Sequence, residues 1–317
     1  MENSKLAVLR FIVILICAIV ILNILRLMFA SSFTLGERVN ILPGKRIGVI
    51  YITGPIYNSK PIVNNLKRFK KDGTIKSIIL RIDSPGGAVA PTQEIVEEIK
   101  NVRSEGKKVI VSCGSVVASG GYYIACVADR IFANPGTLAG SIGVIMEFVN
   151  LEGLLNKIGI KLEVVKSGKY KDIGSSSRKL TSEEQKLLQE VIDDVYHQFV
   201  DAIVDGRKDI LRSKLIKEKG IKKPTREDMK NEILKIADGR IFSGKQAKEL
   251  GLVDELGTMD DAKSYAAMIS GIKGEPEIVE ERKKISFLEY LIGDNDNNLD
   301  NILSKFFHNG FSYLYGE

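Results

Sequence analysis

Between residues 47 and 133 the chain alternates short apolar runs with amphipathic segments. Two segments, 61–73 and 90–105, carry apolar residues at helical spacing and predict helices. The apolar runs predict four buried strands: 47–54, 75–83, 108–113 and 130–133. Strands that alternate with helices pair in parallel through right-handed crossovers. The alternation therefore predicts an α/β protein built on a parallel sheet.

The second half of the chain is less regular. Residues 142–148 and 161–166 are apolar enough to predict two more strands, and Thr181-Ser-Glu-Glu184 is a capping box that predicts a long helix to about Asp205. Residues 207–235 are rich in Lys and Arg without an obvious core pattern, so we expect an insertion with a solvated helical surface. We expect residues 271–317 to form a flexible C-terminal extension.

The N-terminus contains a nearly uninterrupted apolar run at residues 11–25. Counted over residues 7–30, the segment matches the roughly 20 residues that a helix needs to cross a bilayer. A cleaved signal peptide is the alternative, but the run exceeds the usual apolar region of about 7–15 residues, and Met28-Phe29-Ala30 is a poor cleavage site. We expect a single-pass anchor over residues 1–30, a linker over 31–46, and a catalytic domain at the cell membrane outside the cytoplasm.

Composition narrows the choice of partners. The net charge of +6 is spread along the chain without an aromatic-interleaved basic motif, so we expect no nucleic-acid partner. The usual metal-ligand spacings are absent, so we expect no metal.

Three cysteines are too few to form a disulfide framework. Cys113 and Cys126 are expected as buried apolar residues, with a bridge between them left open.

The turn from Ser115 to Cys126 contains the best candidate for a nucleophile. Ser119 precedes two glycines that leave room for a substrate backbone, and it begins an apolar helix whose first amides favour negative charge. Three other serines compete on counting alone: Ser84, Ser112 and Ser115. About thirty residues earlier, Asp83-Ser-Pro-Gly-Gly87 follows a predicted strand, where glycine amides can donate to an oxyanion.

The general base is harder to identify. The only two histidines are His197, in a charged helical stretch, and His308, in the C-terminal tail. Neither setting favours a histidine base in a Ser-His-Asp triad. A lysine can act as the base if burial or a neighbouring cation lowers its pKa. From the residues alone, Lys171 is indistinguishable from three other lysines: Lys166, Lys169 and Lys179.

Five motifs, in order along residues 47–270, together strongly resemble the signal peptide peptidase A (SppA) family in its short, single-repeat form. They are Asp83-Ser-Pro-Gly-Gly87, Ala118-Ser-Gly-Gly-Tyr-Tyr123, Gly140-Ser-Ile-Gly-Val144, Ser167-Gly-Lys-Tyr-Lys-Asp172, and Gly239-Arg-Ile-Phe-Ser-Gly244 followed by Gly251-Leu-Val-Asp254. The resemblance implies a Clp-protease/crotonase-like fold of repeated β-β-α spiral turns and a Ser-Lys dyad.

The resemblance also assigns roles. It implies that Ser119 is the nucleophile, Lys171 the general base, Ser141 the serine that orients the lysine, and Gly86 and Gly120 the oxyanion donors. It implies a serine endopeptidase without a cofactor that degrades remnant signal peptides and other apolar peptides at the membrane. Short-form members complete the dyad across a subunit boundary, so a ring-shaped homo-oligomer is expected.

Three alternatives remain. A Clp-like membrane peptidase could trim one membrane-protein partner, a crotonase-type acyl-CoA enzyme would share the fold without a serine nucleophile, and a catalytically dead scaffold would keep the fold alone. A further hypothesis concerns the aromatic tail Tyr313-Leu-Tyr-Gly-Glu317. An apolar segment on a polar spacer has a high effective concentration near its own chain, so the tail is predicted to dock into the protein's own peptide groove.

Overall fold

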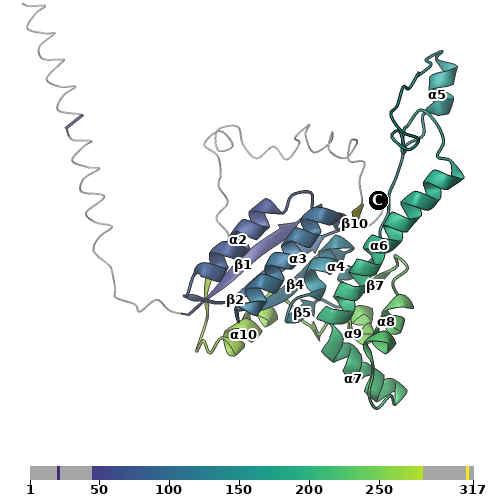
Figure 1. Ribbon diagram of the computed structural model, residues 1–317. Coiled ribbons are helices and arrows are strands. Elements are labelled where there is room, and N and C mark those ends of the chain that lie inside the picture. The colour runs from purple at the N-terminus through teal and green to yellow at the C-terminus, as the bar shows by residue number, and fades with distance from the viewer. Residues whose placement is uncertain (1–19, 22–44, 281–311, 314–317) are drawn as a thin grey trace, which may run out of the picture. The chain divides into compact units, whose positions relative to one another are not determined.

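The computed structural model describes residues 20–21, 45–280 and 312–313 (Figure 1). The chain divides into two compact units, residues 1–44 and 45–317, and the second contains the sheet and the candidate site. The predicted membrane segment at residues 7–30 lies outside the described residues, apart from the helical pair Val20 and Ile21. Within the described part of the chain, no helix is both long and apolar enough to cross a bilayer.

The second unit is organised around a largely parallel sheet with the strand order β7-β6-β4-β2-β1-β9. Outside this order, β5 pairs with β4, and β8 pairs with β5. The long strand β4 pairs with β5 through its first half and with β6 through its last three residues. Only the β6–β7 pair within this sheet is antiparallel. The strands are β1 Arg46–Thr53, β2 Ile75–Ser84, β4 Lys108–Ala118, β5 Arg130–Ala133, β6 Leu138–Gly140, β7 Ile241–Ser243, β8 Glu255–Leu256 and β9 Glu277–Glu280. A second small sheet joins β3 Gly87–Ala88 to β10 Ser312–Tyr313.

Both faces of the sheet are covered, as expected for buried parallel strands. In β2, Ile78, Leu80 and Ile82 belong to the larger core beneath α2, α3 and α4, whereas Ile79 belongs to a smaller core beneath α10. The helices of these two layers are α2 Lys60–Lys71, α3 Val89–Ser104, α4 Gly120–Cys126 and α10 Met259–Ile269. The predicted α/β class and the first four predicted strands are therefore confirmed.

A long helix extends beyond this layered body (Figure 1). Helix α6, Ser182–Gly206, begins at the predicted capping box, where Thr181 and Glu184 exchange side-chain and backbone hydrogen bonds. Its last turns are buried through Phe199, Val200 and Ile203, whereas most of its N-terminal half is exposed. The remaining helices are α5 Glu152–Lys157, α7 Lys208–Lys219, α8 Arg226–Leu234 and α9 Gly244–Leu250.

Two predicted strands are wrong. Residues 142–148 and 161–166 are not in strands, and residues 161–166 are exposed along their whole length. A strand requires a partner for its backbone hydrogen bonds. The segment from residue 145 to 181, which we call the arm, projects past the N-terminal end of α6 and away from the sheet (Figure 1). An apolar pattern predicts a strand, but it does not show whether the chain places a partner strand beside it.

The basic segment and the C-terminal extension also differ from expectation. Residues 208–219 and 226–234 form α7 and α8, and this segment adds to the core because Leu211, Leu215, Met229 and Ile233 are buried. Its lysines obscure an apolar stripe that occupies only one face of each helix. Residues 277–280, near the start of the expected extension, form strand β9, which pairs in parallel with β1. Residues 281–311 and 314–317 of that extension lie outside the described residues.

Candidate active site

Ser119 lies at the junction between β4 and α4. Its amide donates to the carbonyl of Gly140 at 2.8 Å, and its carbonyl accepts from the amide of Tyr123 at 2.9 Å. The backbone at Ser119 has φ 50° and ψ −119°, a conformation that L-residues rarely adopt. Strain of this kind persists only where the surrounding structure enforces it, and it gathers at functional sites.

Helix α4, which begins directly after Ser119, fixes its position. All seven of its residues are buried, and the Tyr122 hydroxyl donates to the carbonyl of Leu252 at 2.8 Å. Gly121 packs so closely that an added Cβ would lie 2.9 Å from the carbonyl oxygen of Ser84. The two glycines after Ser119 therefore let the first turn of α4 abut the loop that contains Asp83 and Ser84.

That loop is tied down by its own polar side chains. Asp83 accepts from the amide of Val116 at 2.9 Å, which joins the loop to β4. The Ser84 hydroxyl donates to the carbonyl of Gly54 at 2.7 Å and accepts from the amide of Gly86 at 3.1 Å. Gly86 has φ 110°, which only glycine adopts without strain. The motif is thus a rigid turn beside the first turn of α4.

The competing serines have other roles or settings. Ser84 is fully buried and engaged as described. Ser112 is also buried, and its hydroxyl accepts from the Arg81 guanidinium at 2.9 Å. Ser115 is exposed on β4, within a cavity that it shares with Thr137 and Leu138. Only Ser119 among the four combines a strained backbone with the start of a buried helix.

Ser141 is the second strained serine. Within the described residues, Ser119 and Ser141 are the only non-glycine positions with a positive φ, and Ser141 has φ 49°. Its amide donates to the carbonyl of Arg240 at 2.9 Å, and it directly follows Gly140, which accepts the Ser119 amide. The tertiary structure therefore brings together Ser119, Ser141 and the Gly86–Gly120 region from separate motifs.

Lys171 has a different position. Its side chain is exposed, and its loop is anchored to the start of α6, where Lys169 and Tyr170 both bond to Glu183. The opposite end of α6 lies at the site, because Phe199 stacks on Tyr123 with ring centroids 4.7 Å apart. At 1.5 Å per residue, the helix separates Glu183 from Phe199 by about 24 Å. The structure therefore does not bring Lys171 to the Ser119 of the same chain.

Sequence reasoning missed the ion cluster that fixes this loop. The Arg178 guanidinium bonds to Asp172 at 2.9 Å and to Glu184 at 2.6 Å, and Lys166 also pairs with Asp172. Hydrogen bonds from Arg178 lower the pKa of Glu184 to about 2, and those from Arg178 and Lys166 hold the pKa of Asp172 well below its usual range. The only signal in the sequence is the mixture of charges around the capping box.

The Gly251-Leu-Val-Asp254 motif connects elements of the core through Asp254. Asp254 accepts from the amide of Ile131 at 2.8 Å and pairs with the buried guanidinium of Arg207 at 2.6 Å. This pair joins β5 to the start of α7. Asp254 therefore has a structural role. Its partner Arg207 belongs to the basic segment that was expected to be solvated.

Cys113 and Cys126 are both free and buried. Burial raises the pKa of each thiol to about 12, so neither is a reactive thiolate near neutral pH. The expectation of buried apolar cysteines is confirmed, and the structure contains no bridge between them.

A cavity of about 280 Å³ begins at Ile142, directly after Ser141. It lies between residues 142–145, α6 and residues 237–239, and its walls mix apolar side chains such as Ile192 with the polar Gln189, Asp193 and Asp238. Because it begins next to Ser141, it has the size and place of a pocket for one side chain of a peptide.

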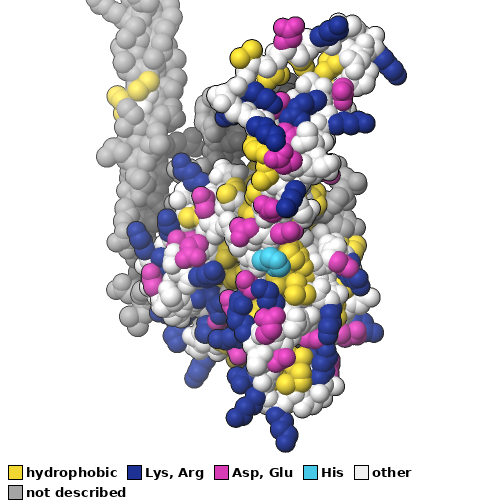
Figure 2. Space-filling view, turned by 45° about the vertical axis from the view of Figure 1, so that its right-hand side comes forward, with side chains coloured by type: hydrophobic (Ala, Val, Ile, Leu, Met, Phe, Trp, Pro, Cys, Tyr) yellow, Lys and Arg dark blue, Asp and Glu magenta, His cyan; other side chains and the backbone are white. Residues whose placement is uncertain are grey.

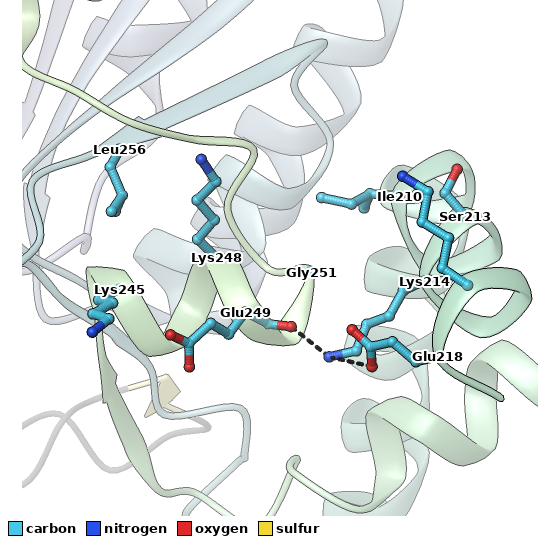
Figure 3. Close-up of a pocket in the computed structure, with 10 residues that line it drawn as sticks. Ile210, Ser213, Lys214, Glu218, Lys245, Lys248, Glu249, Gly251 and Leu256 are labelled. Atoms are coloured by element: carbon cyan, nitrogen blue, oxygen red, sulfur yellow. Dashed lines mark hydrogen bonds and ion pairs between the residues drawn. The ribbon is translucent and has the colours of Figure 1, made fainter.

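A second cavity, of about 440 Å³, lies between α7 and α9 (Figure 3). Four lysines line it, and Lys214 bonds to the carbonyl of Glu249 and pairs with Glu218 at 3.8 Å. No candidate catalytic residue lines this cavity. Among the described residues, no group of three or more His, Cys, Asp or Glu side chains could hold a metal ion.

A strained serine between a parallel strand and a buried helix, beside a rigid glycine turn, has the arrangement expected of the nucleophile and oxyanion site of a serine hydrolase. The chain matches the model described as Peptidase family S49 over residues 101–218 and 223–273. It also matches the Clp protease model over residues 42–137. The chain belongs to Peptidase family S49 and is an SppA-type serine peptidase.

Relatives agree with this assignment. A Synechocystis sp. protein named as a candidate protease is 44% identical over 238 residues, which cover 74% of this chain and 78% of that protein. A candidate protease of Methanocaldococcus jannaschii is 32% identical over 303 residues, or 89% of this chain and 91% of that protein. An Enterococcus faecium protein named as a candidate signal peptide peptidase SppA is 35% identical over 206 residues, or 65% of this chain and 54% of that protein.

The family match also covers the basic segment. The S49 model includes residues 207–235 except for residues 219–222. The segment, expected as an insertion within the peptidase domain of residues 47–270, therefore lies within the matched region. Family membership also sets aside the acyl-CoA alternative.

Proposed function

We propose that this chain is a membrane-anchored endopeptidase that degrades signal peptides left in the membrane after secretion. The observation that carries the proposal is the strained Ser119 at the start of buried α4, next to the glycine turn at residues 83–87. Membership in family S49 and the name of the Enterococcus relative support the substrate class. The apolar run at residues 11–25 supports the anchor, with the catalytic domain on the extracytoplasmic side.

In the proposed mechanism, Lys171 takes the proton of the Ser119 hydroxyl as its oxygen attacks the peptide carbonyl. The amides of Gly86 and Gly120 donate to the oxyanion, and Ser141 orients the lysine amine. The lysine then protonates the leaving amine, and water hydrolyses the acyl-enzyme. No cofactor enters these steps.

The base is supplied by a second copy of the chain in this proposal. The roughly 24 Å along α6 between the anchor of the Lys171 loop and the packing of Phe199 argues against a dyad within one chain. A solvated lysine is also a poor base, because its pKa falls only when burial or another cation disfavours the ammonium form. Docking of the loop into a neighbouring site would provide that burial.

The arm presents the surface for such an assembly. Its exposed apolar side chains are Ile145, Val149, Leu151, Leu154, Ile158, Ile160, Leu162, Val164 and Val165. Figure 2 shows hydrophobic side chains at the surface of this projecting segment, among Lys and Arg residues. Apolar residues gathered on one projection indicate an interface, and a second copy would also provide the partner that residues 161–166 need to form a strand.

The test uses the full-length chain in detergent micelles and a fluorogenic peptide that carries a signal-peptide apolar core. Ser119→Ala is expected to lower kcat/KM by about a thousandfold or more, without a change in melting temperature or oligomeric state. Ser115→Ala, on the same strand but outside the strained junction, is the matched control and is expected to retain activity. Full activity in Ser119→Ala would overturn the proposal.

One alternative within proteolysis is a peptidase that trims a single membrane-protein partner. A panel of unrelated signal peptides distinguishes the two functions. Comparable cleavage across the panel supports signal-peptide degradation, whereas cleavage of none of them by a labelled, assembled enzyme supports a dedicated partner.

A further inference from the structure

The cavity between α7 and α9 has no part in the proposed peptidase mechanism (Figure 3). Its volume of about 440 Å³ falls within the range of about 300–1,000 Å³ that is typical of sites for small molecules. Lys214 and Lys217 line it from α7, and Lys245 and Lys248 line it from α9. Each pair is spaced by three residues, so each helix presents two lysines on one face to the cavity.

The lining has more positive than negative charge. Glu218 and Glu249 are its only acidic residues, so four lysines face two glutamates, with an excess of two positive charges. Ammonium groups that share one cavity repel each other unless an opposite charge lies among them. The lining therefore favours an anion.

Two of the four lysines already have partners within the chain. Lys214 donates to the carbonyl of Glu249 and pairs with Glu218 at 3.8 Å. Lys248 pairs with Glu255 at 3.4 Å. These contacts fix one ammonium group on each helix and partly neutralise both.

The other two lysines, Lys217 and Lys245, form no ion pair with any residue that the structure describes, and both are exposed. Ser213 adds a hydroxyl to the lining, and Ile210 and Leu256 add apolar side chains. A phosphate ester matches this set, because a phosphomonoester carries a charge of about −1.5 to −2 near neutral pH and has three acceptor oxygens. Lysine is a common phosphate ligand, and the apolar side chains can contact the organic part of the ester.

Gly251 keeps the two helices together at this cavity. It ends α9 with φ 81°, and an added Cβ would lie 3.5 Å from the buried side chain of Leu211 in α7. The end of α9 therefore packs against the face of α7 that belongs to the core. The walls of the cavity are held by this packing and by the bond from Lys214 to the carbonyl of Glu249.

We propose that the cavity between α7 and α9 binds the phosphate group of an organic phosphate, and that Lys217 and Lys245 balance its charge. The headgroup of an anionic lipid and a soluble phosphate ester share this chemistry. The inference is independent of the proposed peptidase mechanism, because no candidate catalytic residue lines the cavity.

The test measures binding of radiolabelled glycerol phosphate to the full-length chain in micelles of an uncharged detergent, by equilibrium dialysis. The double variant Lys217→Gln with Lys245→Gln is expected to bind the probe about a hundredfold more weakly, because each hydrogen bond between charged groups contributes about tenfold to affinity. The matched control is Lys222→Gln with Lys223→Gln, which removes the same charge from the loop between α7 and α8, outside the cavity lining. It is expected to change the affinity less than about twofold, because salt screens distant surface charges.

Competition experiments identify the source of the phosphate. Phosphatidic acid in the micelles is expected to displace the probe if the natural ligand is a lipid headgroup, whereas displacement by soluble phosphate esters alone assigns the site to a soluble ligand. Phosphatidylcholine, which has a phosphate but no net charge, is the control and is expected to displace nothing.

Both double variants are expected to keep the wild-type melting temperature, because all four substituted lysines are exposed. Absence of probe binding to the wild-type chain, or an equal loss of affinity in the two double variants, would overturn the inference. Because the readout requires no hydrolysis, a failed cleavage assay would count against the proposed function alone.

Discussion

Individual residues at the site are constrained by backbone geometry more than by side-chain chemistry. Ser119 and Ser141 both adopt positive φ. Gly140, which has φ 101°, accepts a hydrogen bond from the Ser119 amide and directly precedes Ser141. The small residues of these motifs therefore allow backbone segments to approach one another closely, in addition to their proposed role in catalysis.

Gly87→Ala tests this conclusion at one position. The added methyl would push β3 away from Ile56, and a shift of about 1 Å in a catalytic loop can cost about a hundredfold in rate. We expect kcat/KM for the fluorogenic peptide to fall about a hundredfold. Gly73→Ala is the control, because no atom lies within 4 Å of its added Cβ. Near-normal activity in Gly87→Ala would show that β3 tolerates displacement.

Among the secondary-structure elements, α7 is attached to the sheet by a buried charge pair. Loss of one partner leaves the other charge buried, so Arg207→Ala is expected to lower the free energy of unfolding by about 3–5 kcal/mol. Arg226, which pairs with Asp201 and Asp205 at the surface, is the control, and Arg226→Ala is expected to cost below about 1 kcal/mol. Urea denaturation measures both, and equal losses would contradict the structural role of Asp254.

The attachment of the Lys171 loop to α6 should depend on acidity. A carboxyl whose pKa is lowered in the folded state stabilises that state above its unfolded pKa of about 4.3, and the stabilisation is lost as the pH falls toward the folded value. For Glu184 that folded pKa is about 2. We expect faster amide exchange in residues 166–181 as the pH falls from about 4 toward 2, after correction for intrinsic rates.

Arg178→Gln provides the comparison for that experiment. Without the guanidinium, the pKa of Glu184 and of Asp172 returns toward the ordinary range, so exchange in the loop should already be fast near neutral pH and change little on acidification. A loop that stays protected in the variant would show that Tyr170, Lys169 and Glu183 anchor it by themselves.

For the whole molecule, mixing of variants tests whether the dyad is shared between copies. Ser119→Ala and Lys171→Ala are each expected to be inactive. If subunits exchange at random in an equal mixture, about one site in four joins an intact serine to an intact lysine, so about a quarter of the wild-type activity should return. Peptide cleavage after co-refolding or co-expression measures this recovery. A mixture without activity, in assembled oligomers, would place both residues of the dyad in one chain.

The sequence by itself determined the α/β class, the first strands and helices, the capping box at Thr181, and the S49 family, because these depend on local periodicity and on motifs of small residues. Only the tertiary structure decided that Ser84 and Ser112 are structural, that residues 161–166 form no strand, and that Lys171 lies far along α6 from the Ser119 of its own chain. Each depends on what lies opposite in space: a hydrogen-bond partner, a neighbouring strand, or the length of a helix. The pairing of Gly87 with Tyr313 is of the same kind, since it joins residues from distant parts of the chain.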